Sequence, residues 1–231
     1  MSVAGAFLLG VAGANCFGYE ATVGESGNVT NLAPIPLRLP APAFGSWPVT
    51  ESADPHLEPR SSRPRPLFLA PVGVTNLALH KKVTSSDRLL SLSPATLAQI
   101  TDGRKEPQTG DVVYLGTKKQ WVQVDLEAPC RIYAVVIWHD QDSPRIFRCV
   151  VVQSADDAEF TRNVQTLFNN DYANEIGLGV GADKLYRESH EGRLIDAKGV
   201  SARYIRCYSK GSDVEPFNAY AEIEVWGLPV R

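Results

Sequence analysis

The stretch that decides the fold is Gln120–Asp140, with the sequence QWVQVDLEAPCRIYAVVIWHD. In its first part the side chains alternate between an apolar face, made of Val122, Val124 and Leu126, and a mixed face, made of Trp121, Gln123 and Asp125. A period of two is the pattern of a strand with one buried face. The sequence therefore predicts a half-buried strand over Gln120–Leu126.

The second part of this stretch, Ile132–Trp138, is apolar on both faces. It is rich in β-branched and aromatic residues and contains no Gly or Pro, which favours a central strand over a buried helix. We expect this strand to be covered on both sides and to be separated from the first by a turn at 127–129. Because it ends in His139 and Asp140, polar groups should reach the rim of the sheet.

Three more strand-like runs follow, at Phe147–Gln153, Tyr204–Tyr208 and Ala219–Trp226. In the last run, the alternation predicts that Ala219, Ala221, Ile223 and Val225 share one face. There is no long amphipathic helix and no regular exchange of strand with helix. The sequence therefore predicts an all-β fold, an antiparallel β-sandwich, over a domain of about Val72–Leu228.

The composition argues against several classes of partner and activity. The 231 residues are 44% apolar and 21% charged, with a formal net charge of −3. A chain without a strongly basic surface is not expected to bind nucleic acid or an anionic membrane. GxSxG, HExxH and a phosphate-binding loop are all absent, and the four histidines lie in separate segments. We do not expect an enzyme.

The first 14 residues, MSVAGAFLLGVAGA, form an apolar run that ends in a small-x-small pattern. This predicts a secretory signal peptide cut before Asn15, and hence a secreted, periplasmic or cell-surface protein. The alternative is an ordinary buried N-terminus or a mis-assigned start, since no Lys or Arg precedes the run. The run is too short to span a bilayer, so no transmembrane segment is expected.

Residues 15–71 differ in composition from the rest, because ten of the sixteen prolines lie between Pro34 and Pro71. Such a segment can neither build a sheet ladder nor continue a helix, which predicts an extended linker outside the globular core. The alternative is a strap that lies on the domain, with anchors at Phe44, Trp47, Leu67 and Phe68. Both descriptions can hold for different parts.

Five motifs then occur in order within the domain: NLALHKKVTSSD (76–87), ITDGRKE (100–106), WVQVDL (121–126), ARYIRCYS (202–209) and AEIEVWG (221–227). Together they resemble the discoidin family, also called the coagulation factor V/VIII type C domain. The resemblance implies a galactose-binding-like jelly roll. FNNDYANEIGLG and LIDAKGVSARYIR further resemble a subgroup of secreted bacterial proteins.

The resemblance also bears on function. Family-32 carbohydrate-binding relatives bind galactosides and amino sugars, whereas others bind phosphatidylserine or proteins. Two functions follow as expectations. The first is a non-catalytic module that recognises a glycan or glycoconjugate, and the second is an adhesion domain for a surface protein.

Two polar residues are the first candidates for a sugar site. His139 ends the central strand and Arg145 begins the next run, so a hairpin would bring them together at the rim. Imidazole and guanidinium groups can hold vicinal hydroxyls, and the resemblance implies such roles here. The alternative is that Arg145 pairs with Asp140 or Asp142 while His139 only ends the strand.

The aromatic platform that a sugar needs is predicted at Phe217 and Tyr220. The subgroup pattern of Asn-His-Tyr reads Asn218-Ala219-Tyr220 in this chain, so one polar contact is missing. The alternative role for Tyr220 is packing at the end of the barrel.

Calcium is the one cofactor that the resemblance implies. The relevant positions are Asp102 in the DG motif and Glu222 in the last strand, which could supply two of the six to eight oxygen ligands that calcium requires. The alternative is a simple turn at Asp102-Gly103 and a partly exposed strand carboxylate at Glu222. A second acidic loop, at 169–175, is interpreted as a set of Asx turns.

The four cysteines are expected to be free and buried. The predicted hairpin would pair position 135 with 149, so Cys130 and Cys149 should not face each other. Cys207 should share an inward face with Ile205. If the protein is exported, a bridge between Cys149 and Cys207 remains open.

Overall fold

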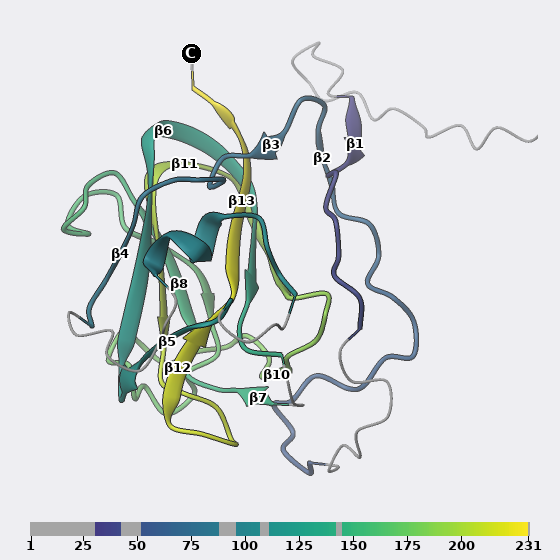
Figure 1. The fold of residues 1–231 in the computed structure, drawn as a ribbon, viewed down its shortest axis with the longest axis vertical. Helices are drawn as coiled ribbons and strands as arrows, with labels where there is room; N and C mark the ends of the chain where they lie inside the picture. Colours follow the sequence, from purple (N-terminus) through teal and green to yellow (C-terminus); the bar gives the residue numbers. More distant parts are fainter. Residues whose placement is uncertain (1–30, 43–51, 88–95, 107–110, 142–144, 231) are drawn as a thin grey trace, which may run out of the picture.

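The computed structural model describes residues 31–42, 52–87, 96–106, 111–141 and 145–230. The predicted signal peptide, Cys16, Phe44 and Trp47 lie outside these residues, so their roles stay predictions. Within the described ranges there is one 3-10 helix, η1 (Leu97–Thr101), and no α-helix. None of these residues forms a helix long and apolar enough to cross a membrane. The predicted all-β antiparallel β-sandwich is confirmed (Figure 1).

The strands are β1 (Leu32–Pro34), β2 (Leu69–Pro71), β3 (Thr75–Asn76), β4 (Val83–Ser85), β5 (Val113–Thr117), β6 (Gln120–Trp138), β7 (Ile146–Phe147), β8 (Val151–Ala155), β9 (Gln165–Asn169), β10 (Tyr186–Arg187), β11 (Arg193–Ser209), β12 (Phe217–Tyr220) and β13 (Glu222–Pro229). The main sheet has the order β3-β13-β6-β11-β8-β9, with β4 also paired to β6. All pairs in this sheet are antiparallel. Figure 1 shows β6 and β11 as long, curved strands through its centre.

The expected turn at 127–129 is wrong, because the two predicted strands are one strand, β6. Both halves of β6 pair with β11, and residues 126–129 bulge opposite the single residue Arg203. Glu127 takes a left-handed backbone conformation, with φ 70°. A bulge of this kind bends a strand without ending its ladder, so the local turn signal did not end the strand.

The sandwich forms where the main sheet packs against the two-stranded sheet of β5 and β12. Val113 and Leu115 of β5, Tyr220 of β12 and Ile100 of η1 meet Val122 and other inward residues of the main sheet. We call this cluster the main core. Because its members are almost fully buried, it is the principal source of apolar burial in the fold.

The predicted face pattern of Ala219–Trp226 is wrong in its second half. Ala219 and Ala221 lie on the outer side of the sheet, whereas Ile223 and Val225 lie in the main core. The alternation shifts by one residue at Ala221, where the chain leaves the β5 partner and joins β6. The shift turns Glu222 to the outer side.

The outer side of the second half of β6 is also apolar, as predicted, and it is covered. Val136 and Trp138 of β6 and Trp226 of β13 pack there against Ile35, Ala70 and other residues of the N-terminal segment. We call this cluster the outer core, and we call residues 31–42 and 52–71 the strap. Figure 1 shows the strap along one side of the sandwich.

The expectation that residues 15–71 form a linker outside the core is therefore wrong for part of this segment, where the alternative of a strap on the domain holds. Ile35 is only 8% exposed within the outer core, and Leu57 only 9% exposed beside Ile146 and Leu185. The prolines of the strap are compatible with this packing, because β1 and β2 form a short two-stranded ribbon and prolines are tolerated in edge strands. Of the predicted anchors within the described residues, Phe68 packs on the outer core and Leu67 is 72% exposed.

Polar contacts also hold the strap to the domain. The Arg65 guanidinium donates to the carbonyls of Gly192 at 2.8 Å and Glu191 at 3.0 Å. Gly192 has φ 63°, and a Cβ there would meet the Trp138 ring at 2.6 Å. Only glycine fits at this position, because the backbone must pass directly over the ring.

The predicted hairpin after His139 is wrong. β7 pairs with β10, and β8 pairs with β11 and β9, so neither is a neighbour of β6. Cys149 lies between β7 and β8 with φ 52°, which breaks the predicted run Phe147–Gln153. Cys130, Cys149 and Cys207 are all free, and Cys207 shares the main core with Ile205 as predicted.

Candidate functional site

The sequence placed a sugar site at the end of β6, but the structure buries His139. Its side chain is fully buried and stacks on the Phe147 ring at 4.1 Å between centroids. Nδ1 lies 2.9 Å from Oε2 of Glu188. The prediction that His139 contacts a ligand at the rim is therefore contradicted, because the chain after β6 turns inward under β7 and β10.

Arg145 is close to the same end of the sandwich, where the alternative interpretation is confirmed. Its guanidinium lies 3.1 Å from Oδ2 of Asp140 and also pairs with Glu215. The Tyr114 hydroxyl donates to the same Asp140 carboxylate. Burial raises the pKa of Tyr114, and the hydrogen bond to Asp140 adds to that effect. The Arg145 side chain is only 7% exposed and forms part of this internal ion-pair network.

The residues of the predicted aromatic platform are separated by the structure. Tyr220 is fully buried, and its hydroxyl lies 2.8 Å from Oγ of Ser209. Asn218 is also fully buried, and its amide donates to the carbonyls of Gly116 and Lys118. Phe217 is 36% exposed. The packing role is thus confirmed for Tyr220, and of these three residues only Phe217 reaches the surface.

The predicted calcium position contains two carboxylates with different surroundings. Oε1 of Glu222 accepts from the backbone N–H of Gly103 at 3.1 Å, and Oε2 is buried without a hydrogen-bond partner. Burial, then the nearby Glu224 and Asp102 carboxylates, raise the pKa of Glu222 to about 9. Oδ1 of Asp102 accepts from the N–H of Arg104, as in a turn.

The surroundings of Glu222 fit a cation in one respect. A buried carboxylate oxygen without a hydrogen-bond partner destabilises the fold unless its charge is neutralised. Within the described ranges, no group of three or more His, Cys, Asp or Glu side chains could hold a metal. Any calcium here would therefore depend on Asp102, Glu222 and carbonyl oxygens. Lys105 supplies a nearby positive charge, with its ammonium 2.6 Å from Oε1 of Glu224.

The loop at 169–175 uses its polar groups internally. The Asp171 carboxylate accepts from the backbone N–H groups of Glu175 at 2.9 Å and Ile176 at 2.6 Å. Asn174 follows with φ 53°. These contacts agree with the interpretation of this loop as a set of Asx turns.

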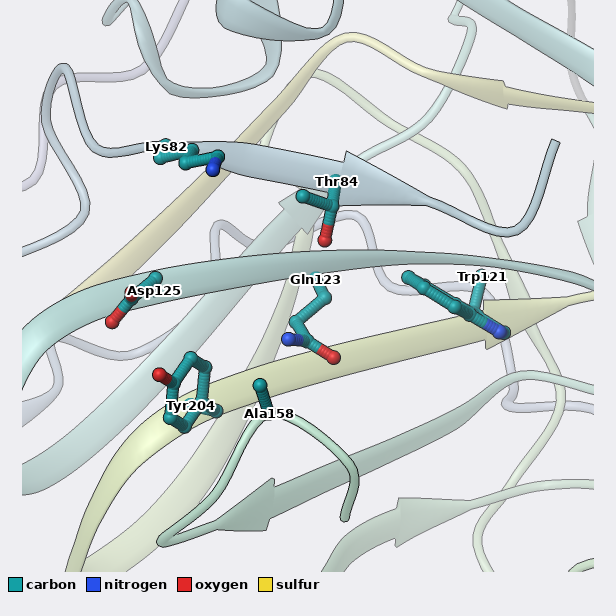
Figure 2. Close-up of a pocket in the computed structure, with 7 residues that line it drawn as sticks. All are labelled: Lys82, Thr84, Trp121, Gln123, Asp125, Ala158 and Tyr204. Carbon is teal, nitrogen blue, oxygen red and sulfur yellow. The ribbon is translucent and has the colours of Figure 1, made fainter. Parts of the chain in front are cut away.

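A groove of about 390 Å³ lies on the outer face of the main sheet, over the first half of β6. Its lining residues are Lys82, Thr84, Trp121, Gln123, Asp125, Ala158 and Tyr204. Figure 2 shows Trp121 at one end, Asp125 and Tyr204 at the other, and Gln123 between them. The groove combines aromatic rings with hydrogen-bonding groups in a shallow, open site.

The register of the sheet builds this groove from three strands. Asp125 of β6 is opposite Tyr204 of β11, and Gln123 is opposite both Thr84 of β4 and Arg206 of β11. Residues directly opposite in an antiparallel pair point to the same side. The intervening residues Val83, Val122, Val124, Ile205 and Cys207 all lie in the main core. The alternation that buries one face of these strands therefore presents the groove residues on the other.

Arg206 lies next to the lining residues Trp121 and Gln123 and orders both of them. Its guanidinium lies between the rings of Trp121, at 4.4 Å, and Phe160, at 3.9 Å, measured to the ring centroids. Nε and Nη2 both donate to Oε1 of Gln123, and Nη2 also donates to the carbonyl of Ala158. Stacking on both sides and these hydrogen bonds fix the Trp121 ring and the Gln123 amide before any ligand arrives.

Two loops lie beside the groove. The loop after β8 contributes Ala158 and Phe160 on one side. Ile176 packs with Tyr208 and Trp121 and covers the neighbouring part of the sheet. The alternation in the sequence predicts the mixed face of Trp121, Gln123 and Asp125, but it does not indicate that this face lines a groove. The other side of the groove is formed by β4, whose pairing with β6 cannot be inferred from either segment alone.

Comparisons with known proteins give structural matches only. No protein-family model matches the chain, and no curated protein matches it. A fucose-binding module of Streptococcus pneumoniae has 20% identity and a TM-score of 0.48, and the match covers 67% of this chain and 96% of that one. Chitosan-binding module 1 of a chitosanase/glucanase from Paenibacillus sp. IK-5 has 18% identity and a TM-score of 0.44, covering 66% and 99%.

A third match is CpGH89CBM32-4 of Clostridium perfringens, solved in complex with GlcNAc-α-1,4-galactose. It has 17% identity and a TM-score of 0.49, and the match covers 68% of this chain and 96% of that one.

Proposed function

We propose that this protein is a non-catalytic sugar-binding module whose ligand lies along the groove over the first half of β6. The observation that carries the proposal is the combination of Trp121 and Tyr204 with Gln123, Thr84 and Asp125 in one open groove. Sugar rings offer C–H faces to aromatic side chains and hydroxyls to amide, hydroxyl and carboxylate groups.

Each part of the groove has a role in this proposal. The Trp121 ring, held by Arg206, is the platform for one sugar ring. The exposed Thr84 hydroxyl lies beside the middle of the groove and binds a sugar hydroxyl (Figure 2). Gln123 is only 6% exposed and its Oε1 accepts from Arg206, so it offers the N–H groups of its amide. Few contacts form and polar groups on both partners lose water, so the affinity is expected between micromolar and millimolar.

The test compares two aromatic residues, the partly exposed Trp121 of the groove and Phe217 at the loop end. A glycan array first selects a ligand for the wild-type protein, and titration calorimetry then measures Trp121→Ala and Phe217→Ala. Loss of the groove platform should weaken binding about tenfold, from the contribution of an aromatic contact and its buried area. Phe217→Ala should leave the affinity within about twofold of wild type, since truncating a lone exposed side chain has a small effect.

The opposite pattern would overturn this location. If Phe217→Ala abolishes binding and Trp121→Ala does not, the ligand binds at the loop end that the sequence first indicated. Thermal melting of both variants shows that each is folded before its affinity is compared.

We also propose a structural calcium ion held by Asp102 and Glu222. The support is the unpartnered buried oxygen of Glu222 and the second carboxylate close to it. Such an ion would supply positive charge that keeps Glu222 ionised. It would stabilise the native state by mass action, without taking part in binding at the groove.

A second candidate, attachment to a surface protein, is favoured by the outward face of β1 and β2. Leu32 and Leu69 are 54% and 41% exposed on this face, and the adjoining Leu67 and Val72 are 72% and 63% exposed. An exposed apolar patch of this kind can mark a protein interface. A folded wild-type protein that binds no glycan on the array would favour this candidate over the first.

A further inference from the structure

Resting on the proposed function of the groove, we infer that its ligand is an anionic polysaccharide, recognised by positive charge from Lys82 and Arg206. The protein as a whole has a formal net charge of −3. A groove with one unpaired cation in its lining, Lys82, and a second beside it, Arg206, is therefore a local feature that its neutral sugar contacts do not explain.

Lys82 is the first part of the argument. It lies at the entry to β4, lines the groove and is exposed. Its backbone carbonyl accepts from the N–H of Asp125, which fixes its place at one end of the groove. Within the part of the chain that the structure describes, its ammonium forms no ion pair, in contrast to its neighbour Lys81, which pairs with Glu127.

Arg206 is the second part. All the hydrogen-bond partners of its guanidinium are neutral, namely the Gln123 amide, the Tyr208 hydroxyl and the Ala158 carbonyl. No carboxylate among the described residues pairs with it. The planar faces are stacked on Trp121 and Phe160. Its positive charge is therefore fixed beside the platform and remains uncompensated.

The one carboxylate in the lining does not cancel these charges. Asp125 accepts from Nε and Nη2 of Arg203 at 2.7 and 2.9 Å, a bidentate pair. That hydrogen bond to Arg203 is the main reason why the pKa of Asp125 is lowered. Glu159 is exposed on the loop after β8, and its negative charge contributes to raising the pKa of Tyr204. Asp125 and Arg203 thus form a neutral unit. On the loop after β8, the Asp157 carboxylate accepts from the Thr161 hydroxyl and from the N–H groups of Thr161 and Arg162, while Asp156 and Glu159 are exposed. Among the side chains that line the groove, Lys82 therefore remains the cation without an ion-pair partner.

The spacing favours a chain over a single sugar. Trp121 and Asp125 are separated by four residues of β6, or about 13 Å at the rise of a strand. A ligand that contacts both ends must extend beyond one ring. Lys82 acts as a point charge, and four of the five N–H donors of Arg206 already have partners, so neither residue imposes the geometry of a particular anion. Carboxylate and sulfate groups on a polysaccharide share the required chemistry.

The experiment measures binding of three polysaccharides to the full chain: polygalacturonate, dextran sulfate and neutral dextran. The proteins are wild type, Lys82→Ala and the matched control Lys81→Ala, which removes the same charge one residue away. Wild type should bind at least one anionic polymer about tenfold more tightly than dextran, and raising the salt concentration should weaken that binding. Lys82→Ala should lose about three- to fivefold in affinity and show a smaller salt dependence, whereas Lys81→Ala should match wild type.

The outcomes separate the two proposals. Preference for polygalacturonate or for dextran sulfate supports the inference and names the anion. Equal binding of dextran and both anionic polymers, unchanged in Lys82→Ala, overturns the inference but leaves the sugar-binding function intact. Equal losses in Lys81→Ala and Lys82→Ala also overturn it, because the effect then comes from the net charge. If the wild-type protein binds neither these polymers nor any glycan on the array, the proposed function itself fails.

Discussion

The two halves of β6 differ in their outer faces, which are mixed in the first half and apolar in the second, and in what surrounds them. In the second half, Val136 and Trp138 are fully buried beneath the strap. In the first half, Trp121 and Asp125 remain partly exposed and line a groove. One strand thus carries both a stabilising outer core and the candidate binding site.

One half of β6 is covered and the other open because different segments pack against their outer faces. The strap brings Ile35, Phe68 and Ala70 onto the second half, and the Arg65 contacts hold it close to Trp138. Over the first half, β4 and the loop after β8 stand beside the strand and leave its mixed face open. A covered apolar face contributes to stability, and an open mixed face is available for a ligand.

The largest expected effect on stability concerns the two tryptophans of β6, one in each half. Trp138→Ala should lower the free energy of unfolding by about 3–5 kcal/mol, because it empties a fully buried site. Trp121→Ala should lower the free energy of unfolding by less, since its ring is partly exposed. Its main effect should be weaker binding of the ligand. Urea unfolding of the two variants checks this. Similar losses of stability would mean that the first half of β6 is as much a core element as the second.

The next effect concerns Glu222, near the covered half, and its sign follows from its pKa. The native value is about 9, against a reference value of 4.5. Between these values the native state holds a proton that the unfolded chain lacks, so stability should fall as pH rises, by about 1.4 kcal/mol per pH unit. In chelator, Glu222→Gln should abolish this slope.

Adding calcium to the same unfolding experiment tests whether the ion binds. If the ion binds at Asp102 and Glu222, it should restore the stability of wild type at high pH and leave Glu222→Gln unchanged. Unfolding curves at pH 5, 7 and 9, with chelator or with calcium, give both answers. Identical wild-type curves in chelator and in calcium would reject the ion, and parallel pH profiles for the two proteins would reject the role of Glu222.

The smallest expected effect concerns the strap itself. Ile35→Ala should lower stability by about 2 kcal/mol, at the low end for a buried aliphatic residue because the site lies near the surface. Binding at the groove should be unaffected, since Ile35 packs only on the outer core. Leu39→Ala is the control, because Leu39 is 44% exposed on the same strap. A loss of affinity in Ile35→Ala would show that the two halves of β6 are coupled.

Prediction of the fold from sequence was accurate where the signal was local. The inward faces of Gln120–Leu126 and Tyr204–Tyr208, and the need to cover Ile132–Trp138 on both sides, all agree with the structure. The errors came at irregular points. The bulge at 126–129 was interpreted as a turn, and the phase shift at Ala221 was not foreseen, because each depends on which partner strand is present.

The site was harder to predict, for the same reason. His139, Asn218 and Tyr220 are polar or amphipathic residues near strand ends, a position that often means exposure. Here β7, β10 and the Ser209 region cover them, and their polar groups find internal partners. No local pattern distinguishes a buried, satisfied side chain from an exposed one.

The sequence by itself determined which residues face inward in the regular segments Gln120–Leu126 and Tyr204–Tyr208, because alternation is a property of the backbone and needs no partner. It also determined the all-β class. Only the tertiary structure decided which outward face is covered and which is open. That choice depends on contacts between distant positions: Ile35 and Ala70 reach the outer side of β6 at Trp138, while Lys82, Asp125 and Tyr204 meet around the groove. Such contacts follow from strand register and chain path, which are fixed only when the whole chain packs together.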